Sequence, residues 1–178
     1  MLRRTFLKYA TFGLNALVAS LVGIPGVAYL LHPLRRKGAK TDFRPVVPLS
    51  ALSASQPTRI TILDTRDDAF TRHTASPIGA VWLVAGKDSA AEGSIHCFQT
   101  ICPHLGCGVD FDAARGAFVC PCHASEFDPS GARRHGPSPR DLDALECRVS
   151  SPDASGQRWV EVRYEEFVTG QSEKTPRT

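Results

Sequence analysis

Cysteine and histidine are concentrated in two short segments of this 178-residue chain. The first reads Cys-Pro-His-Leu-Gly-Cys over residues 102–107, and the second reads Cys-Pro-Cys-His over residues 120–123. Each segment offers one thiolate and one imidazole, together with a further cysteine that a four-ligand site does not need. Two thiolates and two imidazoles can hold a structural zinc ion, or a [2Fe–2S] cluster on which histidines replace two cysteines. A metal centre built from two loops is therefore the strongest constraint on the fold.

The net charge of +3 is unevenly distributed along the chain. Residues 1–44 contain eight Lys and Arg and one acidic residue, whereas residues 45–178 contain 13 Lys and Arg and 17 acidic residues. The second region contains no basic stripe with interleaved aromatic residues, which would indicate a nucleic-acid-binding surface. We therefore expect no nucleic-acid partner, and one domain that follows an N-terminal accessory segment.

The N-terminal region combines basic residues with a long apolar segment. Residues 1–9 contain Arg3-Arg4-Thr5-Phe6-Leu7-Lys8, which resembles the core of the twin-arginine export signal. Residues 10–31 carry no charge, and a helix of that length would span about 33 Å, enough for a bilayer core of about 30 Å. We predict a single transmembrane anchor. The alternative is a signal peptide cleaved near Ala28, because Gly26-Val27-Ala28 is a small-x-small site.

Positive charge flanks both ends of the apolar segment, so the Lys and Arg residues do not define its orientation. The twin-arginine route exports proteins already folded around a cofactor. We therefore expect the folded domain on the periplasmic side of a bacterial inner membrane. Residues 32–44 are predicted to form a flexible basic linker, which could also contact anionic lipid head groups. Residues 171–178 are predicted to be a polar, frayed tail.

From Pro45 onward, short runs of Val, Ile, Phe and Trp alternate with Gly, Pro, Asp and Ser clusters, which predicts an all-β domain. One run places Val160 and Val162 on one face and Trp159 and Glu161 on the other. Helical patterns are weak, and the best candidate covers residues 64–72. The predicted strands cover residues 46–49, 59–63, 80–85, 94–100, 108–111, 117–119, 145–150 and 158–164.

The two Cys/His segments, the N-terminal signal, the anchor, the linker and the later segment Gly136-Pro137-Ser138-Pro139 together resemble one family. These features are similar to the Rieske iron–sulfur subunits of bacterial cytochrome bc-type quinol–cytochrome c reductases, whose segments read Cys-x-His-Leu-Gly-Cys and Cys-Pro-Cys-His-Gly-Ser. The resemblance implies a Rieske-type antiparallel β-sandwich over residues 45–170, with a small inserted cluster-binding subdomain at about residues 101–140. It also implies one Rieske-type [2Fe–2S] cluster, because zinc would leave the two extra cysteines without a role.

Family roles can be assigned to the matching ligands. Cys102 and Cys120 would bind the inner iron as thiolates, and His104 and His123 would bind the outer iron. Each histidine would keep its second ring nitrogen at the surface, where it could carry the proton that accompanies an electron. Neutral imidazoles make the cluster less negative than four thiolates do, which raises its reduction potential.

The other four cysteines fall into two pairs. In the family, the equivalents of Cys107 and Cys122 form a disulfide between the two ligand loops, and export permits such a bond. Cys97 and Cys147 lie in predicted strands, where we expect buried free thiols rather than a second disulfide.

Residues around the ligands would complete the cluster-binding site. Gly136 and Pro137 would begin a stiff loop that covers the cluster from a third side. The hydroxyl of Ser125 would bind a bridging sulfur, whereas Phe127 replaces a tyrosine that bonds a cysteine sulfur in many members. The missing hydrogen bond predicts a lower midpoint potential, suited to menaquinol. Ala124 replaces the usual glycine, which is tolerated unless this position needs a positive φ.

The resemblance implies a redox carrier in a respiratory oxidoreductase rather than a stand-alone enzyme. It would take one electron, coupled to a proton, from quinol at a cytochrome b subunit, and pass the electron to the haem of a c-type cytochrome; menaquinol is the favoured quinol. The alternative is the Rieske small subunit of a periplasmic molybdenum oxidase such as arsenite oxidase, in which a Ser-Glu-Phe run like residues 125–127 is common. A ferredoxin of a ring-hydroxylating oxygenase is disfavoured by the export signal and the extra cysteine pair.

Overall fold

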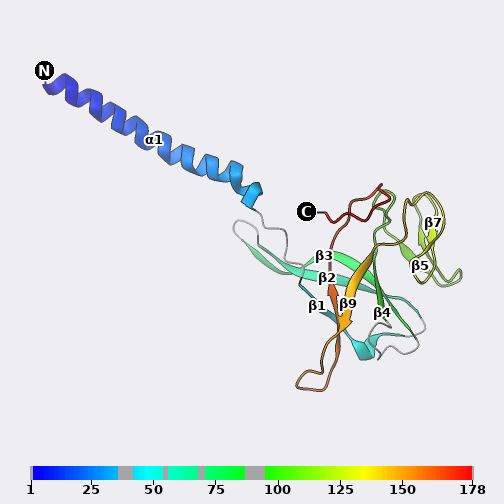
Figure 1. Ribbon diagram of the computed structural model, residues 1–178. Coiled ribbons are helices and arrows are strands. Elements are labelled where there is room, and N and C mark those ends of the chain that lie inside the picture. Colours follow the sequence, from blue (N-terminus) through cyan, green and yellow to red (C-terminus); the bar gives the residue numbers. More distant parts are fainter. Residues whose placement is uncertain (1, 36–41, 54–55, 68–70, 87–94, 178) are drawn as a thin grey trace. The chain divides into compact units, whose positions relative to one another are not determined.

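The chain forms two compact units, Met1–Lys40 and Thr41–Thr178, in the computed structural model. The structure describes residues 2–35, 42–53, 56–67, 71–86 and 95–177 (Figure 1). The first unit is one helix, α1 (Leu2–Arg35), and its segment Leu2–Leu31 is long and apolar enough to cross a membrane. The helix includes residues 32–35, where the sequence predicts linker. Linker residues 36–41 lie outside the described residues.

The second unit contains a six-stranded antiparallel sheet in the order β1-β10-β9-β4-β3-β2. Its strands are β1 (Arg44–Pro48), β2 (Thr58–Asp67), β3 (Arg72–Ala85), β4 (Ile95–Gln99), β9 (Ala144–Val149) and β10 (Trp159–Arg163), and the short 3-10 helix η1 (Leu49–Ala51) follows β1. Arg44 of β1 forms an ion pair with Asp64 of β2 at a Nη1–Oδ2 distance of 2.7 Å. Because these are the two edge strands, the sheet curls around its buried face.

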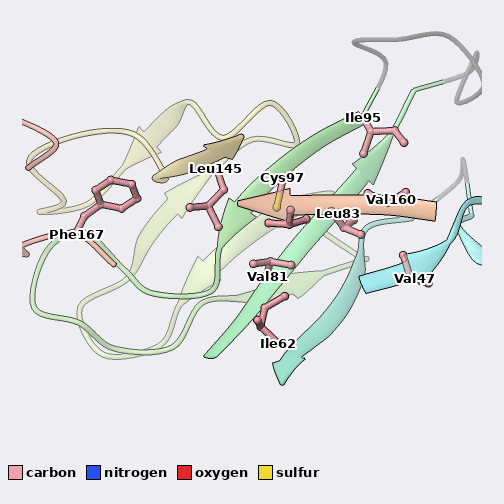
Figure 2. Packing of buried hydrophobic residues seen from close by; sticks show 10 residues of the cluster. Val47, Ile62, Val81, Leu83, Ile95, Cys97, Leu145, Val160 and Phe167 are labelled. Atoms are coloured by element: carbon pink, nitrogen blue, oxygen red, sulfur yellow. The ribbon is translucent and has the colours of Figure 1, made fainter. Parts of the chain in front are cut away.

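Apolar side chains from every strand of this sheet converge on its interior, as Figure 2 shows. In β10, Val160 and Val162 are buried, whereas Trp159 and Glu161 are partly exposed. This alternation confirms the predicted faces, because successive residues of a strand point to opposite sides. The core contains Val47, Ile62, Val81, Leu83, Ile95, Cys97, Leu145, Val160, Val162 and Phe167.

A smaller antiparallel sheet is inserted in the chain between β4 and β9, with the order β5-β6-β7-β8. Its strands are β5 (Asp110–Asp112), β6 (Ala117–Cys120), β7 (Ser125–Phe127) and β8 (Arg133–His135). A second core joins it to the larger sheet, where Trp82 of β3 packs against Phe118 of β6. The indole of Trp82 also donates a hydrogen bond of 2.9 Å to the Val109 carbonyl. Antiparallel sheets after one apolar helix confirm the predicted fold class.

The helix predicted over residues 64–72 is wrong for the described part of that range. Residues 64–67 end β2, Arg72 begins β3, and Asp67 pairs with Arg72. This charged segment lacks an apolar helical face, so cross-strand pairing is favoured over a short isolated helix.

The prediction of a frayed C-terminal tail is also wrong for residues 171–177. Its backbone is hydrogen-bonded to residues 166–168. The Val168 amide donates to the Thr175 carbonyl at 2.9 Å, and the Arg177 amide donates to the Glu166 carbonyl at 2.7 Å.

Candidate metal centre

The first Cys/His segment is a tight loop closed by a β-bridge between Ile101 and Gly108. The amide of Cys102 donates to the Cys107 carbonyl at 2.7 Å, and the amide of Gly106 donates back to the Cys102 carbonyl at 3.0 Å. The loop buries the side chain of Cys102, which is 1% exposed, and leaves His104 partly exposed. A thiol therefore faces the domain interior while an imidazole of the same loop reaches solvent.

The second segment connects β6 to β7, since Cys120 pairs with Ser125 at the end of the two strands. Cys120 is buried and His123 is exposed, so this loop repeats the arrangement of the first. Ala124 has a φ of 55°, a left-handed conformation that costs a residue with a Cβ about 1–2 kcal/mol. This position does need a positive φ, and alanine in place of the family's glycine is therefore strained.

A disulfide joins Cys107 to Cys122, the pair that the family resemblance implies, with a Cα–Cα distance of 6.5 Å. It holds the two loops together at one end of the small sheet. The imidazole rings of His104 and His123 lie with their centroids 4.8 Å apart and their planes at 85°. Two histidines of distant sequence position thus face one site.

The buried side of this site is formed by the thiols of Cys102 and Cys120. Burial raises the pKa of Cys102; the amide of His104 lowers it, the Cys120 thiol raises it, and the Ser125 hydroxyl lowers it. A thiol of raised pKa stays protonated, so a metal that binds here must displace a proton. Of the four predicted ligands, Cys102 and Cys120 therefore lie together on the buried side, and His104 and His123 lie together on the side that reaches solvent.

A second group of cysteines lies in the same place. The sulfurs of Cys107, Cys120 and Cys122 are all within 4.8 Å of one another. Two of these sulfurs are joined to each other in the disulfide, so they cannot bind a metal as thiolates. The donor set that remains is two thiols and two imidazoles, which fits a [2Fe–2S] cluster with mixed ligands.

The segment Gly136-Pro137-Ser138-Pro139 lies against the second ligand loop. Gly136 has a φ of +94°, and a Cβ on this residue would lie 2.4 Å from the Ser125 Cα and 2.7 Å from the Ala124 carbonyl oxygen. The amide of Ser138 donates to the Ser125 hydroxyl at 3.2 Å, while Pro137 is exposed. Only glycine permits so close an approach, and the buried Ser125 connects this segment to the cysteine side of the site.

Phe127 completes the buried side of the site. Its side chain is fully buried in β7 and belongs to the same apolar cluster as Cys102 and Cys120. A phenylalanine offers this cluster no hydrogen-bond donor. The lower reduction potential expected from the missing hydroxyl stays a prediction.

Three arginines beside the site, Arg133, Arg134 and Arg140, and the acidic partners of the last two were not predicted. Arg133 donates from Nη1 to the carbonyls of Gly136 (3.3 Å) and Ser138 (3.0 Å), which holds the Gly-Pro segment in place. Arg134 pairs with Glu126 of β7 at 3.5 Å. Arg140, which pairs with an acid, directly follows the Gly-Pro segment. Their position next to that segment was the only signal in the sequence.

The remaining cysteines and His135 take no part in the site. Cys97 is a buried free thiol whose pKa is raised by burial, and Cys147 is a partly buried free thiol that donates to the Ile95 carbonyl at 3.1 Å. Both observations confirm the prediction of free thiols. His135 is exposed at the end of β8, as expected of a surface residue.

Comparisons with known proteins agree with this geometry. A family model described as Rieske [2Fe-2S] domain matches residues 43–147. The cytochrome b6-f complex iron-sulfur subunit of Synechococcus sp. (strain RCC307) is 34% identical over 82 residues, which cover 46% of this chain and 44% of that protein. In this match the chain thus spans less than half the length of the relative. The corresponding subunit of Synechococcus sp. (strain WH7803) is 28% identical over 95% of this chain and 90% of its own length. The plasma membrane Rieske protein PetC3 from Synechocystis PCC 6803 is 36% identical over 48% of this chain and 79% of its own, with a TM-score of 0.37.

Proposed function

The chain belongs to the Rieske [2Fe-2S] family, and we propose that it is the electron-transfer subunit of a cytochrome bc-type quinol–cytochrome c oxidoreductase. One observation carries the proposal: two disulfide-linked loops each carry one buried cysteine and one histidine that reaches the surface, and the two imidazole centroids lie 4.8 Å apart. The chain acts as a redox carrier within the complex, not as a stand-alone enzyme.

We assign the ligands as the sequence predicts. Cys102 and Cys120 would hold the inner iron as thiolates, and His104 and His123 would hold the outer iron. When bound, the [2Fe–2S] cluster supplies a one-electron acceptor whose potential is raised by the neutral imidazoles. The buried cysteine side would keep water from the cluster, while His104 and His123, which reach the surface, would each keep a second ring nitrogen accessible. These nitrogens accept a hydrogen bond from the quinol hydroxyl and hold the proton that leaves with the electron.

The partners follow from this role. The chain receives one electron from quinol at a cytochrome b subunit and passes it to the haem of a c-type cytochrome. Helix α1 anchors the chain by a single pass in a bacterial inner membrane, with the Rieske domain on the periplasmic side. Arg3 and Arg4 belong to a twin-arginine signal, and the apolar Phe127 supports menaquinol as the favoured donor.

A periplasmic molybdenum oxidase is the competing assignment. It is supported by the Ser-Glu-Phe run at residues 125–127, and such subunits also share the export signal, the fold and a related second motif. The two Synechococcus relatives are named as subunits of cytochrome b6-f complexes, which supports the first assignment.

The test is to solubilise membranes that contain the full-length chain and to purify it by a C-terminal tag. We expect b-type haem in the purified fraction and reduction of the cluster, seen as its EPR signal, by added menaquinol. A Cys102→Ser variant serves as the control, since it should lose the cluster signal and yet retain the b-type haem. Co-purification of a molybdopterin protein without b-type haem would reject the proposal.

A further inference from the structure

Arg140 directly follows the Gly-Pro segment beside the predicted ligands. Its side chain is 9% exposed, and the side chain of its partner Asp143 is 4% exposed. Two parallel hydrogen bonds join them, from Nε to Oδ1 and from Nη2 to Oδ2, each 2.8 Å long. Such a two-pronged contact fixes the orientation of the guanidinium plane.

The rest of the guanidinium is directed at the C-terminal segment of the chain. Nη2 donates to the Val168 carbonyl at 2.9 Å, and Nη1 donates to the carbonyls of Gln171 (2.5 Å) and Glu173 (3.4 Å). With the two bonds to Asp143, these contacts use all five N–H donors of an arginine. A buried arginine with every donor bound is a specific clamp and not an incidental surface contact.

The clamped segment lies on the first ligand loop. The amide of Gly170 donates a 2.8 Å hydrogen bond to the carbonyl of Pro103, the residue between Cys102 and His104. A Cβ on Gly170 would lie 3.6 Å from the His104 carbonyl oxygen. Figure 1 shows this C-terminal segment, in red, returning beside the green segment that follows β4.

The clamp is also connected to the other parts of the site. The Ser138 hydroxyl donates to the Arg140 carbonyl at 2.7 Å, and the Ser138 amide reaches Ser125. The backbone carbonyl of Asp143 accepts from the amide of Gln99 in β4 at 2.9 Å, and the Gln99 side chain donates to the Glu165 carbonyl. Arg140 therefore lies where the Gly-Pro segment, the large sheet and the C-terminal segment meet.

From these contacts we infer that Arg140, paired with Asp143, is a positioning residue for the first ligand loop. It holds residues 168–173 against the backbone of residues 102–106, and this fixes the direction in which His104 projects. The inference rests on the proposed function only in taking Cys102 and His104 as ligands. The C-terminal segment is thus part of the metal centre's support, although no Cys or His lies in it.

The test uses an apolar double variant, Arg140→Met with Asp143→Leu, which removes the clamp without leaving a buried unpaired charge. The matched control is Arg148→Met with Glu161→Leu, which removes an exposed pair of 2.7 Å between β9 and β10. Hydrogen exchange followed by mass spectrometry is measured on the cluster-loaded, full-length protein in detergent. The EPR spectrum of the reduced cluster is recorded on the same samples.

We expect exchange in residues 103–107 and 168–173 to accelerate at least tenfold in the Arg140 double variant, with no change in β10. The EPR line shape should broaden in that variant and stay unchanged in the control. Unaltered exchange in both segments would overturn the inference. An equal acceleration in β10 would also overturn it, because the Arg140–Asp143 pair would then contribute only to the overall stability of the domain. If the double variant does not fold, Arg140→Lys is used instead, because it keeps the charge but loses the two parallel hydrogen bonds to Asp143. The inference requires that exchange in residues 103–107 and 168–173, and not in β10, also accelerates in this variant. Since exchange does not depend on quinol oxidation, this test can fail while the proposed function stands, and the reverse.

Discussion

At the scale of single residues, two side chains distinguish the site: Phe127 lacks a hydroxyl group, and Ala124 carries a methyl group where glycine would be favoured. Phe127 is buried with both predicted cysteine ligands and brings no hydroxyl to them. Ala124 carries a methyl group at a backbone angle that favours glycine. The first bears on the reduction potential, and the second is a cost in stability.

Phe127→Tyr should raise the midpoint potential of the cluster. A new hydrogen bond to a cysteine sulfur would favour the more negative, reduced state, and about 1 kcal/mol corresponds to roughly 40 mV for one electron. A redox titration followed by EPR measures the shift. Phe111→Tyr is the control, because Phe111 is at the edge of the same cluster and partly exposed. An unchanged potential in Phe127→Tyr would refute the assigned role of this position.

Ala124→Gly should stabilise the domain. Glycine relieves a strain of about 1–2 kcal/mol at φ 55° and loses part of this gain to the greater freedom of the unfolded chain. We expect a net gain of about 1 kcal/mol and a thermal midpoint about 3 °C higher, measured by circular dichroism. Ala113→Gly, at a loop position that is not among the positive-φ residues, should instead lower the midpoint. A lower midpoint for Ala124→Gly would contradict the strain.

At the scale of elements, the metal centre depends on contacts between loops that follow strands of both sheets. The disulfide ties the two ligand loops together, and the Gly-Pro segment closes against the second loop. The C-terminal segment closes against the first. The last two contacts involve backbone atoms, and at the first of them a Cβ on Gly136 would lie 2.4 Å from the Ser125 Cα, so only glycine fits there.

Gly136→Ala should displace the Gly-Pro segment. The added Cβ would meet the backbone of Ser125 at 2.4 Å, in addition to the strain of a positive φ. Gly116→Ala is a matched control, because Gly116 also has a positive φ but a Cβ added there would have nothing within 4 Å. We expect Gly136→Ala to lose about 2 kcal/mol more than the control in thermal unfolding, together with some bound iron. Equal losses in the two variants would show that the close approach is unimportant.

Much of this element-scale arrangement could be predicted from sequence. The alternation in residues 158–164 identified β10, and the two cysteine-rich motifs located both ligand loops. β7 and β8 were not predicted, because each is three residues long and lies among loop-forming residues. Arg140 was not predicted either: its partners include carbonyls of Val168 and Gln171, and no side-chain pattern in the sequence records a backbone contact.

At the scale of the whole molecule, one apolar helix and one β domain are joined by a segment that is mostly outside the described residues. The two units are compact by themselves. In the proposed function, a membrane-bound carrier must meet both a cytochrome b site and a c-type haem, and it therefore needs reach between them. The predicted linker is where that reach would come from.

Replacing residues 35–41 with a rigid helical spacer should abolish quinol–cytochrome c turnover in membranes while the cluster still assembles. A Gly/Ser replacement of equal length should preserve turnover, because flexible chains keep their reach. Turnover is measured by cytochrome c reduction, and cluster assembly by EPR. Normal turnover with the rigid spacer would argue against a mobile domain.

Every role proposed for this chain depends on one [2Fe–2S] cluster held by two thiolates and two imidazoles. The most direct test labels histidine with ¹⁵N in the full-length protein and records ENDOR spectra of the reduced state, with iron, sulfide and zinc measured per chain. We expect two irons, two sulfides and two strongly coupled nitrogens, one of which disappears when His104 or His123 is replaced by cysteine. One zinc ion per chain, or a cluster without coupled nitrogen, would contradict this ligand set.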